Sequence, residues 1–164
     1  MTASVEARPL EEEALFNPAF LAVMLHAAAA EHSKRSHGRG LPILLAYLVV
    51  PLALHGPTRR SLPRGVAAQL GEWVRAHPEA LAGLDERTRA LRPLVSAGLR
   101  LGLAHGALRS GDGVIEPGPL HRRPRGMARS PEVDECIAKA GFLGRWFSEQ
   151  PDAQTVMALW GLRA

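Results

Sequence analysis

The side chains that could bind a metal ion are scattered along this 164-residue chain. It has seven histidines and one cysteine. His26, His32 and His37 are six and five positions apart, whereas residues on one helix face are three or four apart, so one helix cannot bring all three to a metal ion. His105 and His121 have no carboxylate or cysteine at ligand spacing. We therefore predict no metal site and no cofactor.

Signatures of covalent or nucleotide chemistry are also missing from the sequence. Cys136 falls on the apolar face of a predicted helix, where we expect a buried small hydrophobe and not an activated thiol. Gly38-Arg39-Gly40 and Gly111-Asp112-Gly113 lack the third glycine of a dinucleotide-binding loop. No GxxxxGK[ST], HExxH or GxSxG motif occurs. The sequence predicts that the chain is not an enzyme.

The composition favours helices as the elements that position these residues. Alanine (26) and leucine (24) dominate, while phenylalanine, tryptophan and tyrosine together number 8. Alanine and leucine are strong helix formers, and strands prefer aromatic and β-branched residues. We expect a mainly α-helical single domain over residues 14–164, preceded by a loose acidic leader at 1–13.

Capping and turn residues predict where the elements begin and end. Asn17-Pro18, Ser130-Pro131 and Pro151-Asp152 are typical helix starts. Asp112-Gly113 predicts the turn of a small β-hairpin. Glycines at 98, 102 and 106 are spaced for close packing of a helix. The expected helices span 18–30, 41–55, 63–77, 86–107 (kinked or broken at Pro93) and two within 131–162, with a basic irregular loop at 116–130.

The longest apolar run, Leu41–Leu54, is too short to span a membrane, which takes about 18–20 residues. Pro42 and Pro51 interrupt it. We expect it to be core, although an exposed interface is the alternative. The acidic triplet Glu11–Glu13 near the N-terminus does not fit a secretory signal, so we expect a cytoplasmic protein without membrane contact.

Positive charge gathers in the middle of the chain. Residues 34–77 carry +6, whereas residues 1–33 carry −4 and residues 131–164 carry −2. Between 43 and 115 the order of helices followed by a hairpin is typical of a winged-helix domain, which can bind DNA phosphates or dock a protein. A solvated surface rich in arginine is the third interpretation. The candidate nucleic-acid or partner contacts are Arg59, Arg60, Arg64, Arg109, Arg122, Arg123 and Arg125.

Three segments together are similar to a known family. They are Phe16-Asn17-Pro18-Ala19; Gly40-Leu41-Pro42 through Val50-Pro51-Leu52 to His55-Gly56-Pro57-Thr58-Arg59 and Leu62-Pro63; and Phe142–Phe147 followed by Thr155–Arg163. The pattern resembles the small middle component of bacterial ABC three-component systems, which are conflict or antiphage operons related to the Lamassu group. The likeness covers about residues 14–163. Trp160 departs from it, because a smaller aliphatic residue is expected there.

The resemblance implies a non-catalytic adaptor. Its partners would be an ABC ATPase of the SMC or Rad50 type and an effector such as a nuclease, with DNA contacted through the complex. The residues themselves leave a second function open, which is a DNA-binding winged-helix regulator.

Overall fold

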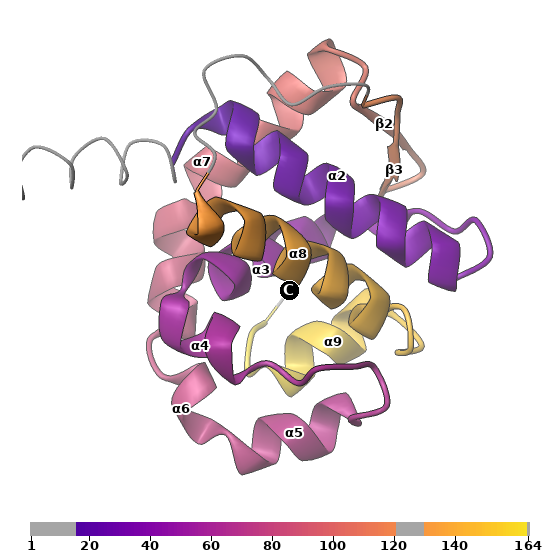
Figure 1. Ribbon diagram of the computed structural model, residues 1–164. Helices are drawn as coiled ribbons and strands as arrows, with labels where there is room; N and C mark the ends of the chain where they lie inside the picture. Colours follow the sequence, from indigo (N-terminus) through magenta and orange to yellow (C-terminus); the bar gives the residue numbers. More distant parts are fainter. Residues whose placement is uncertain (1–15, 121–129, 164) are drawn as a thin grey trace, which may run out of the picture.

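The computed structural model describes residues 16–120 and 130–163, and the chain is mainly helical with one small sheet (Figure 1). The acidic leader and the arginines at 122, 123 and 125 lie outside these residues. In chain order the elements are α2 (Pro18–Arg35), β1 (Leu41–Pro42), α3 (Ile43–Leu54), α4 (Gly56–Ser61), α5 (Leu70–Ala76), α6 (Pro78–Leu81), α7 (Leu84–Ala104), β2 (Leu108–Gly111), β3 (Val114–Pro117), α8 (Pro131–Phe147) and α9 (Ala153–Leu159).

Three predicted helix starts are confirmed by their caps. The Asn17 side chain accepts a hydrogen bond from the Ala19 N–H at 2.9 Å. Ser130 Oγ accepts from Val133 N–H at 3.2 Å, and Asp152 Oδ1 accepts from Thr155 N–H at 2.7 Å. Each bond satisfies a backbone donor that the helix cannot pair by itself.

Helix α3 forms the centre of the hydrophobic core. Residues 45, 46, 48–50, 52 and 53 are each at most 2% exposed, which confirms that the apolar run is core. Helices α2, α7, α8 and α9 all pack on α3, and α2 also lies along α8 and α7 (Figure 1). Within residues 16–120 and 130–163, no helix is both long and apolar enough to cross a membrane.

A third strand joins the predicted hairpin. The turn at Asp112-Gly113 is confirmed, since both residues have positive φ (53° and 76°), as a type I′ turn requires. Strand β1 pairs antiparallel with β3, Leu41 opposite Ile115, and the sheet order is β1-β3-β2. The prediction of one helix over 41–55 was therefore wrong at its start, because Leu41 and Pro42 are drawn into the sheet.

The helix expected over 63–77 is reduced to α5, Leu70–Ala76. Pro63 and Gly65 lie in the preceding segment, residues 62–69, which forms bends and a short turn instead of a helix. Trp146 Nε1 of α8 donates a 2.7 Å hydrogen bond to the carbonyl of Ala68. That carbonyl is satisfied by a side chain 78 residues away in sequence, a partner that local periodicity cannot reveal.

Helix α7 runs through Pro93 without a break, so of the two predicted outcomes, a kink or a break, the break does not occur. Pro93 is exposed, so water can bind the carbonyl left without a helical N–H partner. The helix begins after Gly83 and ends at Ala104, and Gly106 follows in the left-handed conformation (φ 71°). Gly106 therefore ends the helix instead of packing it.

Two of the glycines expected to allow close packing do so. A Cβ at Gly98 would lie 2.8 Å from Leu21 Cβ, and one at Gly102 would lie 2.7 Å from Leu108 Cδ1. Gly144 of α8 is tighter, since a Cβ there would overlap the Ala28 carbonyl oxygen of α2. Gly98 and Gly144 set how closely α2 approaches α7 and α8, and Gly102 sets how closely β2 approaches α7.

Substituting Gly144→Ala is expected to destabilise the fold by about 1–3 kcal/mol, because the added methyl group meets backbone that cannot move aside cheaply. Gly71→Ala is the matched control. Its Cβ would make an ordinary 3.4 Å contact with Leu159, and we expect it to be neutral or stabilising by up to about 1 kcal/mol. Denaturant unfolding of both variants tests this, and equal stabilities would contradict it.

Candidate functional site

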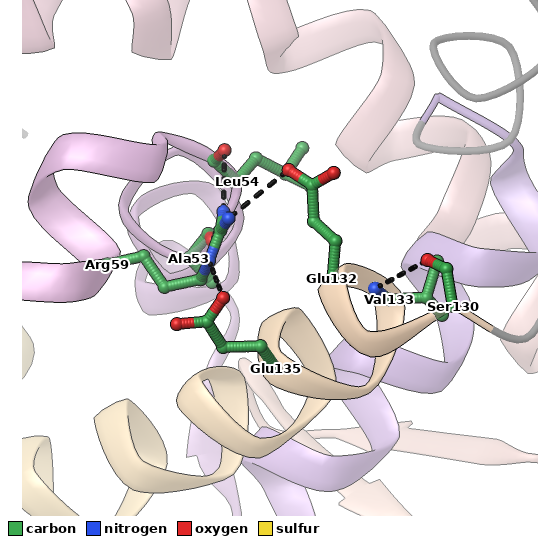
Figure 2. Close-up of polar contacts among 7 residues, drawn as sticks. All are labelled: Ala53, Leu54, Arg59, Ser130, Glu132, Val133 and Glu135. Atoms are coloured by element: carbon green, nitrogen blue, oxygen red, sulfur yellow. Dashed lines mark hydrogen bonds and ion pairs between the residues drawn. The ribbon is translucent and has the colours of Figure 1, made fainter. Parts of the chain in front are cut away.

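Arg59, in one of the segments that carry the resemblance, is buried and joins two helices (Figure 2). Its side chain is 2% exposed. Nη1 donates to the carbonyls of Ala53 and Leu54, both at 3.0 Å. Nη2 lies 3.2 Å from Glu132 Oε1, and Nε lies 3.1 Å from Glu135 Oε2. The guanidinium thus connects the end of α3 to the first turns of α8.

The charges at this junction suit the helix ends that meet there. The last carbonyls of α3 have no helical N–H partner and carry partial negative charge, which a cation stabilises. Glu132 and Glu135 sit near the positive N-terminal end of α8 and remain 49% and 40% exposed. The planar guanidinium donates hydrogen bonds to the two α3 carbonyls and to Glu132, and it forms an ion pair with Glu135 in which Nε makes no hydrogen bond to the described residues. An ammonium group cannot match this geometry.

The tight α3–α4 turn carries Arg59 into the junction. His55 caps α4: its Nδ1 lies 2.7 Å from Thr58 Oγ1 and accepts from Thr58 N–H at 3.4 Å. Burial lowers the pKa of His55, and the cations of Arg87, Arg59 and Arg60 lower it further. A neutral imidazole keeps the lone pair that this cap uses.

Cys136 lies beside the junction and is fully buried, which confirms its expected packing role. Burial raises the pKa of its thiol to about 11, and Glu132 and Glu135 add to the rise while Arg59 opposes it. The thiolate that a nucleophile or soft metal ligand requires is therefore disfavoured at neutral pH.

The other predicted arginines are distributed differently. Arg60 and Arg64 are exposed, on α4 and on the segment that follows it. Arg109 is exposed on β2, where Nη2 donates to the Pro117 carbonyl at 3.2 Å. Of the predicted set within the described residues, Arg59 alone is buried; the other three stand at the surface. The three arginines at 122, 123 and 125 lie outside the described part of the chain.

A second basic site, which our sequence reasoning missed, surrounds a surface hollow of about 510 Å³. We call it the α3–α7 hollow. Arg89 and Arg92 come from α7 and Arg163 from the residues after α9. The remaining lining residues are Ile43, Leu44, Tyr47, Asp85, Thr88, Met157 and Leu162. Arg89 and Arg92 are three apart on a predicted helix, so their shared face was a usable signal.

Several histidines have structural partners. His26 Nε2 lies 2.8 Å from the Gly118 carbonyl oxygen, and His77 Nδ1 lies 2.7 Å from that of Trp73. His32 Nδ1 lies 3.2 Å from the Arg39 carbonyl oxygen. Across residues 16–120 and 130–163, no group of three or more His, Cys, Asp or Glu side chains is arranged to hold a metal ion.

Replacing Arg59 with methionine is expected to cost about 2–4 kcal/mol, because the α3 carbonyls lose their charged donors. Arg59→Lys should recover only part of this loss. The matched control is Arg60→Met at the exposed neighbour, which should change stability by less than about 0.5 kcal/mol. Denaturant midpoints measure all three variants, and a tolerated Arg59→Met would refute the structural role of this arginine.

Comparison with known proteins identifies the family. No curated protein and no solved structure matches the chain. A family model does match, over residues 5–164, and its description is "ABC-three component (ABC-3C) system Middle Component 3". The match includes the Arg59 junction, the exposed arginines and the α3–α7 hollow. The chain therefore belongs to the Middle Component 3 family of ABC-three component systems.

Proposed function

We propose that this chain is a non-catalytic adaptor in an antiphage complex, where it links an SMC- or Rad50-like ABC ATPase to an effector such as a nuclease. The observation that carries the proposal is the family match over 5–164, since a middle component is by description one part of a multi-component system. The adaptor itself acts in the cytoplasm and contacts DNA only through the complex.

The chemistry of the described residues supports this role. The one cysteine is buried with a raised pKa, and the best-connected charged side chain, Arg59, is occupied in holding helices together. Exposed arginines are available for contacts with other subunits. The junction and the core therefore serve the fold, and the surface serves the assembly.

A DNA-binding winged-helix regulator is the second candidate. The order of α3, later helices and the β2–β3 hairpin favours it, as does the β1-β3-β2 arrangement of the sheet. Arg60 and Arg109 are exposed cations that could bind phosphates. The winged-helix interpretation itself stays a prediction.

Co-expression of this chain with the proposed ATPase and effector of the same system tests the adaptor role. We expect the three to elute as one complex in size-exclusion chromatography with light scattering. The ATPase and effector alone form the control and should elute separately, because the adaptor supplies both interfaces. An ATPase–effector complex that forms equally well without this chain, or a chain that elutes alone, would contradict the proposal.

Duplex binding by the isolated chain tests the regulator. If the chain is a regulator, its affinity should fall steeply with salt, and the triple variant R60A/R64A/R109A should lower affinity and reduce the slope by about one per lost phosphate contact. Arg59 is left intact, since its loss would disturb the fold. Absence of duplex binding at low salt would remove this candidate.

A further inference from the structure

We infer that the α3–α7 hollow is the docking site for an acidic segment of another subunit of the same system, with an apolar side chain of that segment seated in the hollow. The inference rests on the proposed adaptor function and names a surface for one of its interfaces. It places the contact with the partner away from the Arg59 junction between α3 and α8.

Charge is the first argument for an acidic partner. Arg89, Arg92 and Arg163 line the hollow and are all exposed, against one acid, Asp85. Asp85 forms an ion pair with Arg89 one helical turn away. The side chains of Asp85 and Arg89 are largely solvent-exposed (65% and 75%), so this ion pair stabilises the helix little. Either side chain can therefore turn to bind a partner. Because no other acidic residue among those described lines the hollow, Arg92 and Arg163 face no lining carboxylate of their own.

The lining beneath the arginines is the second argument. Met157 and Leu162 are buried, while Ile43 and Leu44 at the start of α3 are only partly buried, although most of that helix is core. Thr88 also lines the hollow, but its Oγ1 is buried and offers no contact to a ligand. A bound segment would bury the part of Ile43 and Leu44 that is still exposed.

The two features together favour a peptide over a nucleic acid. A phosphate backbone needs cations but gains nothing from a concave apolar floor. An acidic segment with a central apolar residue uses both, since the apolar residue fills the hollow and the carboxylates bind the guanidinium groups bidentately. The volume of about 510 Å³ is within the range of typical small binding sites, about 300–1,000 Å³.

The experiment uses the complex formed by the full chain with the co-expressed ATPase and effector. The photo-crosslinking residue benzoylphenylalanine replaces Leu44, which lines the hollow. As a control it replaces Leu103, an exposed residue near the C-terminal end of α7. Separately, R89E/R92E is compared with R100E, an exposed arginine on the same helix that does not line the hollow. Thermal melting should show both charge variants folded.

We expect position 44, but not 103, to cross-link to an acidic segment of one subunit. R89E/R92E should weaken binding of that subunit about tenfold or more, R100E much less, and reversing the charges of the cross-linked segment should restore binding to R89E/R92E. If the wild-type complex forms and R89E/R92E leaves it intact, the inference fails while the proposed function stands. The inference also fails if R89E/R92E weakens only the binding of duplex DNA and not the binding of the subunit. A wild-type chain that joins no complex would overturn both the inference and the proposed function.

Discussion

Much of the arrangement of this protein depends on one buried guanidinium. Helix α3 is apolar throughout its core-facing length, so its last carbonyls would have to be buried without partners if no donor reached them. Arg59 supplies that donor and at the same time binds two carboxylates at the start of α8. Because α8 also lies along α2, the position of α3 relative to the outer helices is set at this point.

This arrangement takes Thr58 and Arg59, which lie in a segment that resembles the family, away from the surface. Thr58 and Arg59 are both buried, and His55 caps the turn between them and α3. Side chains buried in this way stabilise the fold without touching any partner. The surface left for assembly is defined by exposed side chains, among which the arginines of the α3–α7 hollow are grouped around apolar surface.

Local signals predicted much of the fold, and partners distant in sequence account for most of what they missed. The caps at Asn17, Ser130 and Asp152 and the Asp112-Gly113 turn depend only on neighbouring residues, and all were found. Strand β1 exists only because Ile115 pairs with it from 74 positions away.

Local sequence patterns also did not predict which side chains are buried. Arg59 belongs to a basic stretch of sequence, and its acidic partners lie 73 and 76 positions later. Trp160, the departure from the family pattern, fills space beside Trp73 with ring centroids 5.8 Å apart. Neither environment can be deduced from periodicity.

Hydrogen–deuterium exchange on the chain alone and within the assembled complex tests the central claim most directly, which is that the Arg59 junction holds the fold while the α3–α7 hollow meets the partner. The account predicts new protection in residues 43–47, 85–92 and 157–163, and unchanged exchange in residues 53–60 and 131–136, which the partner does not contact. Protection centred on 56–64 and 108–117, with none around the hollow, would contradict it.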